Sequence, residues 1–194
     1  MSLKNLSART KIPKLLENKL KNKKIIQIYK KFERSLNINK RFAVAVSGGP
    51  DSLALAFLSK IYSIKKKIST KFLIVDHKLR PESTKEAKLV KKVLNQFYIK
   101  SEILTWRGKK PLKNIQSLAR KKRYELLFNA CRKLKIDDIL LGHHLDDLFE
   151  NFFIRLLRGS GLKGLISFRE KKVKIDKKNI YLLISLLNIS KKDL

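Results

Sequence analysis

One hexapeptide limits the folds open to this chain more than any other feature. It follows a short apolar run at residues 41–46 and reads Ser47, Gly48, Gly49, Pro50, Asp51 and Ser52. The run is typical of a buried parallel strand, and residues 51–62 are predicted to form the helix after it. Two glycines allow a tight turn close to a ligand, and N–H groups at a helix start attract anions. The hexapeptide therefore predicts a strand–loop–helix unit that cradles phosphate.

Asp51 is the unusual member of this loop, because a carboxylate repels phosphate unless a cation lies between them. A Mg²⁺ ion bridging Asp51 and pyrophosphate oxygens resolves the conflict. No lysine follows the glycines, so the loop differs from the G-x-x-x-x-G-K-[ST] loop of other nucleotide-binding proteins. The hexapeptide alone is also compatible with a plain strand–turn–helix connection in which Asp51 caps the helix.

Strands and helices are predicted to alternate along the rest of the chain. Apolar runs at residues 71–75, 99–106 and 138–141 indicate strands, and helical patterns cover 114–134 and 146–157. Such alternation predicts an α/β fold, a Rossmann-like parallel sheet with helices on both faces. The 114–134 helix has an apolar face made by Ile115, Leu118, Leu126, Leu127 and Cys131.

Four further segments refine this prediction. Ser83 begins another helix, and Glu86 three residues later indicates a capping box. Residues 171–178 indicate a solvated hairpin or loop, and residues 179–189 a strand and turn. Residues 4–39 are basic and contain one helical pattern at 25–36. We therefore expect a helical N-terminal extension over residues 1–40 and one α/β domain over residues 41–194.

Polar residues gather where three predicted strands end, which is where ligands bind in open α/β sheets. The first group is the hexapeptide, the second is Asp76 with His77, and the third runs from His143 and His144 to Asp147. Asp76 and His77 either line a nucleotide pocket or fix Arg80. Adjacent histidines point different ways at a strand end, so we expect only His143 to contact a ligand.

Charge is the most extreme property of the composition. Lys and Arg number 47 against 16 acids in 194 residues, giving a formal net charge of +31. Such a field favours polyanions, nucleic acid first and an anionic membrane surface second. Drift of the amino-acid composition towards lysine, isoleucine and asparagine in an AT-rich genome is a third explanation. The only cysteine, Cys131, excludes an internal disulfide and a cysteine-rich zinc site, and we expect it to be buried. No apolar run is long enough to span a bilayer. We expect an intracellular protein, in the cytoplasm or in an organelle.

Four motifs in the same order resemble those of the tRNA(Ile)-lysidine synthase family, within the N-type ATP pyrophosphatases that carry a PP-loop. The first motif is the hexapeptide, and the others follow at residues 75–83, 114–124 and 141–161. In this family, ATP adenylates the C2 oxygen of the wobble cytidine in an isoleucine tRNA with a CAU anticodon. The ε-amine of free L-lysine then attacks C2 and expels AMP. The resemblance leaves a homodimer open and implies no membrane partner.

The resemblance also implies roles for particular residues. It implies catalytic roles for Asp51, Arg120, Asp147 and Glu150, with Asp147 and Glu150 binding lysine and Asp51 holding Mg²⁺. Asp146, at the start of the same predicted helix, is suited instead to capping it. It implies ATP binding by Ser47, Gly48, Gly49, Pro50, Asp51, Ser52, Asp76, His77, Arg120 and His143.

The chain departs from the family pattern at several positions. The family often has glycine in place of Lys78, and glutamine and threonine in place of Leu148 and Asn151. It usually has Arg-Pro in place of Ile184 and Ser185. Family members also continue into a tRNA-binding region after this domain, so we expect that region to be absent or truncated here. The basic surface and the extension are then expected to supply some tRNA contacts.

Three other functions share parts of this pattern. A tRNA-thiolating enzyme has the same ATP loop but usually needs paired cysteines. An amidating ligase shares the loop and lacks the segment at residues 75–83. An inactive RNA-binding relic of the fold is the third alternative, against which the intact hexapeptide, Arg120, Asp147 and Glu150 argue.

Overall fold

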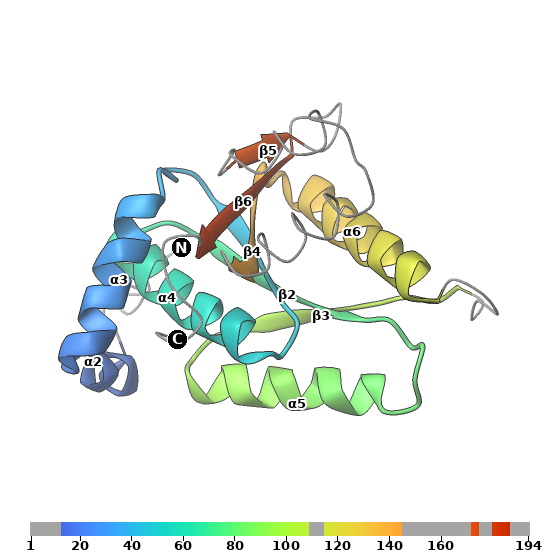
Figure 1. Cartoon of the computed structure of the whole chain (residues 1–194), viewed down its shortest axis with the longest axis horizontal. Coiled ribbons are helices and arrows are strands. Elements are labelled where there is room, and N and C mark those ends of the chain that lie inside the picture. Colours follow the sequence, from blue (N-terminus) through green and yellow to red (C-terminus); the bar gives the residue numbers. More distant parts are fainter. Residues whose placement is uncertain (1–12, 109–114, 145–171, 175–179, 187–194) are drawn as a thin grey trace, which may run out of the picture.

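The computed structural model describes residues 13–108, 115–144, 172–174 and 180–186. Within these ranges six strands form one sheet in the order β3-β2-β1-β4-β6-β5 (Figure 1). Neighbouring strands pair in parallel, except that β5 and β6 are antiparallel. The predicted α/β fold is confirmed, β6 confirms the strand predicted within residues 179–189, and β5, within residues 171–178, pairs with it. The strands are β1 Phe42–Val46, β2 Thr70–Asp76, β3 Ser101–Thr105, β4 Asp138–His144, β5 Lys172–Lys174 and β6 Tyr181–Leu186.

Helices cover both faces of the sheet, as predicted. Phe42, Val44 and Val46 point into one apolar cluster with α4 (Pro50–Lys65) and α5 (Ser83–Gln96), while Ala43 points into a second cluster with α6 (Ile115–Leu134). This alternation follows from the two-residue period of a strand. Figure 1 shows α5 below β2 and β3, and α6 above them.

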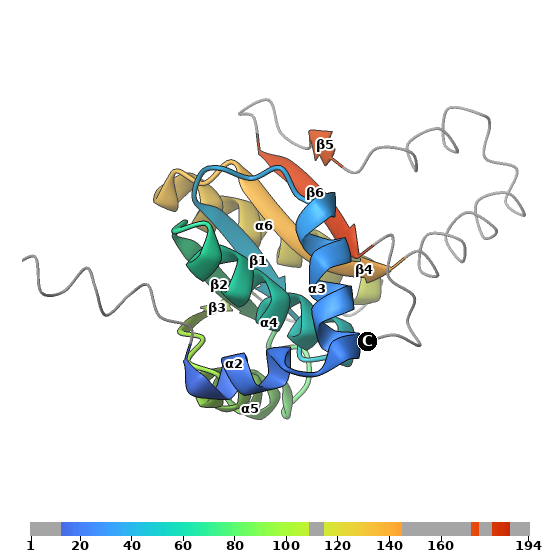
Figure 2. The same cartoon turned by 90° about the vertical axis from the view of Figure 1, so that its left-hand side faces the viewer.

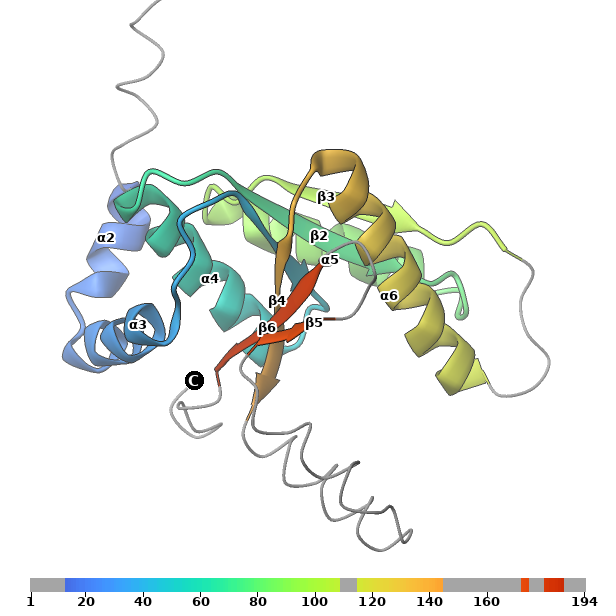
Figure 3. The same ribbon diagram turned by 90° about the horizontal axis from the view of Figure 1, so that it is seen from above.

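The strand order reverses beside β1, and this reversal positions the site. The chain runs outward from β1 to β2 and β3, and then returns to place β4 on the other side of β1. The carboxyl ends of β1 and β4 therefore diverge towards different crossovers, which opens a crevice where ligands bind in such sheets. Figure 3 shows the twist, with β4 and β6 running steeply across β2 and β3.

Two helices occur in the N-terminal extension, whereas the sequence predicts one. Helix α2 (Lys14–Leu20) was not predicted, and α3 (Lys23–Ser35) begins two residues before the expected start. Asn22 caps α3 by accepting hydrogen bonds from the N–H groups of Lys24 and Ile25. Tyr29 and Phe32 on α3 are buried in the cluster of α4, and Figure 2 shows α3 beside α4 and β6. The domain boundary at residue 40 stays a prediction.

Three helices end with the same motif. Just after α4, α5 and α6, the backbone N–H of an isoleucine donates to the carbonyl of the residue five positions earlier. In α4, for example, the N–H of Ile68 donates to the carbonyl of Ser63 at 2.8 Å. The residue before each isoleucine has positive φ, a conformation that favours glycine, yet the chain has Lys67, Tyr98 and Lys135 there. These helix ends therefore have the usual hydrogen bond of a C-terminal cap, but the backbone of the residue with positive φ is strained.

Three details of the elements differ from the sequence predictions. The capping box is wrong: Glu82 is the N-cap of α5 and makes no side-chain cap, while Ser83 and Glu86 bond elsewhere. Ile115 is 42% exposed and lies off the apolar face of α6, although Leu127 and Cys131 are fully buried as predicted. Strand β4 extends through His143 and His144 instead of ending at residue 141. None of the helices in the described ranges has the length and apolarity to cross a membrane.

Candidate nucleotide site

The loop at residues 47–52 is organised around the hydroxyl of Ser52. This oxygen lies 3.2 Å from the backbone nitrogen of Ser47 and 3.1 Å from that of Gly48, and it accepts from both. It also accepts from the Ser47 hydroxyl at 3.1 Å and donates to the Gly49 carbonyl at 2.9 Å. A hydroxyl has one proton, so Ser52 does not donate to a phosphate while it makes this bond. In this arrangement its role is to fix the loop.

The helix that follows the loop starts in a way suited to anions. Gly49 is the N-cap of α4 without a side-chain cap, and Pro50 occupies the first helical position, where its missing N–H costs nothing. Asp51 lies in the first turn, where the helix dipole stabilises its negative charge. The alternative that Asp51 is the helix cap is therefore wrong, because the cap position belongs to Gly49.

Two glycines are required by close contacts around the loop. Gly48 has φ +94°, and a Cβ there would lie 2.5 Å from Cγ2 of Val90 on α5. Gly142 on β4 faces the start of α4, where a Cβ would lie 3.0 Å from Cα of Ser52. The sequence suggested no role for Gly142. Its contact brings the carboxyl end of β4 against the loop.

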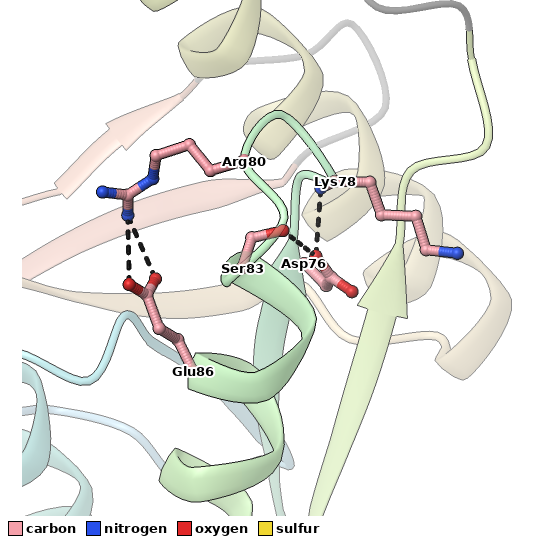
Figure 4. Close-up of polar contacts among 5 residues, drawn as sticks. All are labelled: Asp76, Lys78, Arg80, Ser83 and Glu86. Atoms are coloured by element: carbon pink, nitrogen blue, oxygen red, sulfur yellow. Dashed lines mark hydrogen bonds and ion pairs between the residues drawn. The ribbon is translucent and has the colours of Figure 1, made fainter.

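Asp76 at the end of β2 holds the next turn together (Figure 4). Its Oδ1 accepts from the backbone N–H of Lys78 at 3.0 Å and from the hydroxyl of Ser83 at 2.8 Å. Its Oδ2 accepts from the hydroxyl of Thr84 at 2.7 Å. Burial alone raises the pKa of Asp76, but these hydrogen bonds outweigh it and hold the pKa below its ordinary value. Lys78 has φ +49°, which explains why glycine suits this position.

Arg80 has a different partner from the one considered in the sequence. Its guanidinium lies 3.0 Å from a carboxylate oxygen of Glu86 on α5, so the idea that Asp76 fixes Arg80 is wrong (Figure 4). Both side chains are largely exposed. The pair therefore contributes little stability and can open when another anion arrives.

His77 contacts Arg123 on α6. Nε of Arg123 donates to Nε2 of His77 at 3.4 Å, so the imidazole proton resides on Nδ1. Nδ1 is buried and has no hydrogen-bond partner within the described part of the chain. Burial lowers the pKa of His77 and the charge of Arg123 lowers it further, against a smaller opposing effect of Asp76. His77 is thus neutral at pH 7.

A cavity of about 270 Å³ joins these groups. This volume is near the lower end of the roughly 300–1,000 Å³ found for small-molecule sites. Its walls come from β1, β2, β4, α5 and α6, and Tyr124 and Leu127 supply part of the apolar side. The polar lining consists of Ser47, Ser52, His77, Arg80, Ser83, Glu86 and Arg123.

The residues predicted for the site fall into three groups. Ser47, Ser52 and His77 line the cavity, whereas Gly48, Gly49, Pro50 and Asp51 of the same loop are not among its lining residues. Asp76 is buried behind it, and Arg120 is exposed one helical turn before the lining residue Arg123. Asp146, Asp147 and Glu150 lie outside the described residues, as do the side chains of His143 and His144. Arg123 and Tyr124 were not predicted for the site, although they stand beside Arg120 in the sequence.

The residues present fit a Mg²⁺ ion shared with phosphate. No three His, Cys, Asp or Glu side chains cluster as a metal cage within the described ranges. Mg²⁺ commonly binds one or two carboxylates together with substrate phosphates, and Asp51 supplies one carboxylate within the loop, in the first turn of α4. Such an ion would neutralise charge between Asp51 and the phosphates.

Known proteins similar to this chain share its sequence pattern. The sequence model of the family described as "PP-loop domain" matches residues 17–194. A protein named tRNA(Ile)-lysidine synthase from Orientia tsutsugamushi is 46% identical over 156 residues, covering 80% of this chain and 34% of that protein. Proteins of the same name from Rickettsia bellii and Rickettsia rickettsii are 40% and 36% identical, covering 72% and 86% of this chain. The chain spans about a third of the length of these relatives.

A solved structure shares the fold. The U34-tRNA thiolase NcsA from Methanococcus maripaludis, with its [4Fe-4S] cluster, superposes with a TM-score of 0.71 at 21% identity. The match covers 88% of this chain and 61% of the thiolase chain. At this identity the likeness concerns the fold alone.

Proposed function

Because this chain belongs to the family of PP-loop domains, we propose that it binds ATP in the cavity at the carboxyl ends of β1, β2 and β4. The observation that carries the proposal is the loop at residues 47–52, which lies against Gly142 at Ser52 and shares one cavity with His77 and Arg123. The first turn of α4 offers N–H groups to phosphates. The apolar wall at Tyr124 and Leu127 suits the base and sugar of a nucleotide.

The two arginines of α6 have separable roles in this proposal. Arg123 lines the cavity and lies against His77, so it is placed to contact the nucleotide directly. Arg120 is exposed, one turn nearer the start of the helix, and remains our candidate for the phosphates or for the incoming RNA. His77 orients Arg123 by accepting its hydrogen bond at Nε2, while its buried Nδ1 is closed to a ligand oxygen. Asp76 acts indirectly, by holding the turn that carries His77.

We propose that the bound ATP adenylates the wobble cytidine of an isoleucine tRNA with a CAU anticodon. The C2 oxygen of the cytidine attacks the α-phosphorus, and pyrophosphate leaves. The ε-amine of L-lysine then attacks C2, and AMP leaves with the former C2 oxygen. Donors fixed around the α-phosphate stabilise the charge that develops there, and Mg²⁺ held by Asp51 and the phosphates would offset their charge. Support comes from the relatives named tRNA(Ile)-lysidine synthase.

The lysine site rests on residues outside the described ranges. Asp147 and Glu150 are three residues apart, so their carboxylates converge if the segment is helical. Two carboxylates suit an ammonium group and can hold lysine while its amine loses a proton. We propose that they bind the lysine substrate beside the adenylated base. A homodimer stays an open proposal.

The thiolating alternative is disfavoured by one observation. Cys131, the chain's lone cysteine, is fully buried on α6, and burial raises the pKa of its thiol to about 12. A thiol in this state is neither a good nucleophile nor a cluster ligand. The fold shared with the thiolase therefore does not extend to sulfur chemistry at this residue.

The test is transfer of radiolabelled lysine to isoleucine tRNA in the presence of ATP. We expect incorporation by the wild-type chain and none by Asp51→Ala, because Asp51 holds the metal. A tRNA whose anticodon is CAG in place of CAU serves as the negative control. No incorporation by a folded wild-type chain would favour the inactive relic, and equal activity of Asp51→Ala would remove this residue from the site.

A further inference from the structure

The outward face of α5 carries a row of lysines that the fold does not explain. Ala87, Val90 and Leu94 form the inward face of α5 and pack in the core cluster against the sheet. On the opposite side Lys85, Lys88, Leu89 and Lys92 are all exposed, and their spacing of three, four and seven residues places them on one stripe. We call these four residues the α5 stripe. Leu89 is 61% exposed at its centre.

The charges of the α5 stripe oppose the helix that carries them. Lys85 and Lys88 are three residues apart, and Lys88 and Lys92 are four apart, so neighbouring ammonium groups repel each other. Lys85 also lies in the first turn, where the helix dipole disfavours a cation. Glu86 is the only acid in α5, and it is paired with Arg80. Folding gains nothing from this pattern, whereas a bound polyanion would relieve all of the repulsion.

The α5 stripe leads away from the cavity. Ser83, Glu86 and Ala87, in the first turns of α5, line the cavity wall. Lys85 and Lys92 are seven residues apart, so the stripe extends about 10 Å along the helix surface. Beyond the end of the helix, Tyr98 is 62% exposed. A row of cations beside exposed apolar side chains, Leu89 and Tyr98, is the pattern that single-stranded nucleic acid recognises.

We propose that the α5 stripe binds the sugar–phosphate backbone of the RNA whose target nucleotide enters the cavity, with Tyr98 stacking on a base at the far end. The proposal rests on the proposed function, which supplies RNA as the substrate. Arg80 connects the two regions, because it lies at the cavity mouth and its exposed pair with Glu86 can open to a phosphate. The stripe thereby makes α5 an RNA contact beside the cavity.

The test compares two triple variants with the same change of charge. The first is Lys85→Gln, Lys88→Gln and Lys92→Gln on α5. The control is Lys67→Gln, Lys133→Gln and Lys135→Gln, exposed positions near the amino ends of β2 and β4. Each 194-residue chain is titrated with fluorescent CAU-anticodon tRNA over a range of salt concentrations. Thermal unfolding confirms that both variants fold, and lysine incorporation is measured in parallel.

We expect the α5 variant to bind tRNA about 10- to 100-fold more weakly, with the slope of log K against log salt reduced by about two to three. The control variant should retain wild-type binding within about threefold. Equal weakening of both variants, or tRNA binding too weak to measure in the wild type, would overturn the proposal. So would an α5 variant that loses only its binding to vesicles of phosphatidylserine and phosphatidylcholine, since the stripe would then bind membrane.

The two proposals fail separately in this experiment. If the wild type incorporates lysine but the α5 variant binds tRNA normally, the α5 stripe is wrong and the enzyme assignment stands. If tRNA binding depends on the stripe but no lysine is incorporated, the RNA surface stands and the lysidine assignment falls. Tyr98→Ala extends the test, because stacking on one base predicts weaker binding with an unchanged salt slope.

Discussion

The hydroxyl oxygen of Ser52 lies 3.1 Å from the backbone nitrogen of Gly48 and accepts its hydrogen bond, so a side chain inside the loop fixes the loop's own backbone. The same oxygen binds Ser47 and Gly49. Ser52 is only 4% exposed, and β4 contacts its backbone through Gly142. The loop is therefore shaped before any phosphate arrives, which reduces the ordering cost of binding.

Replacing Ser52 tests this organisation. Ser52→Ala leaves two N–H groups without their acceptor, so we expect the free energy of unfolding to fall by about 1–3 kcal/mol and the Kd for ATP to rise. Ser59→Ala is the matched control in the same helix. Its buried hydroxyl has no partner within the described residues, so its loss should cost less than about 0.5 kcal/mol. Chemical denaturation and nucleotide titration check both, and similar effects of the two variants would contradict the account.

Gly48 and Val90 should be coupled. Gly48→Ala adds a Cβ that would lie 2.5 Å from Val90, at a φ of +94°, and we expect a loss of about 2–4 kcal/mol. Val90→Ala in the same chain removes the overlapping methyl group and should restore about 1–2 kcal/mol of the lost free energy of unfolding, as measured by a double-mutant cycle. Strain from the positive φ remains. Val90→Ala should not rescue Gly142→Ala, because the added Cβ at Gly142 meets the backbone of Ser52. If the effects of Gly48→Ala and Val90→Ala on stability are simply additive, Gly48 and Val90 are not in contact.

The glycines of the hexapeptide illustrate how far the sequence leads. Their order after an apolar run predicted the strand, the loop and the helix correctly, because tight turns and buried strands have strong local signals. The contact of Gly48 with Val90 on α5 could not be predicted, since it joins segments that are far apart in the chain. Gly142 was missed for the same reason. The role of the Ser52 hydroxyl as an acceptor for the loop's own N–H groups was also not predicted, because it depends on the shape of the turn.

The hydrogen bonds of Asp76 predict a pH dependence. Its pKa is held below the ordinary value of 3.8, so its contribution to stability is complete above pH 3.8 and is lost as the pH falls through the folded-state pKa. Asp76→Asn should reduce the free energy of unfolding by about 2–3 kcal/mol at pH 7. The difference between variant and wild type should shrink below pH 3.8, as measured by denaturation at several pH values. A difference independent of pH would show that the ionised carboxylate is not the cause.

The ends of α4, α5 and α6 offer a test of backbone strain. Glycine in place of Lys67 or Lys135 should raise the free energy of unfolding by about 1 kcal/mol, because positive φ strains residues with a Cβ. Tyr98→Gly should be equally stabilising but should weaken RNA binding if the aromatic ring stacks on a base. Lys133→Gly, within the last turn of α6, is the control and should cost about 1 kcal/mol. Destabilisation by glycine at Lys67 and Lys135 would refute the strain.

The helix ends and the apolar face of α6 show where the spacing of residues in the sequence fails to predict burial and capping. Leu127 and Cys131 were placed correctly, because their spacing matches the buried face of α6. Ile115 was misplaced, since a residue in the first turn can lie beyond the edge of the sheet that it is spaced to meet. Ser83 and Glu86 match a capping box in sequence, but Asp76 and Arg80 are better partners for them in space. Contacts between segments that are far apart or in different elements therefore determined the positions of Ile115, Ser83 and Glu86.

The most direct test of the central claim follows the α-phosphate of ATP. The chain is incubated with CAU-anticodon isoleucine tRNA and ATP labelled at the α-phosphate, first without lysine and then with it. We predict that label becomes attached to the tRNA with release of pyrophosphate, and that lysine then discharges it as AMP. AMP formed without tRNA, or a tRNA that never acquires label from a folded chain, would contradict the proposal that this site adenylates the wobble cytidine.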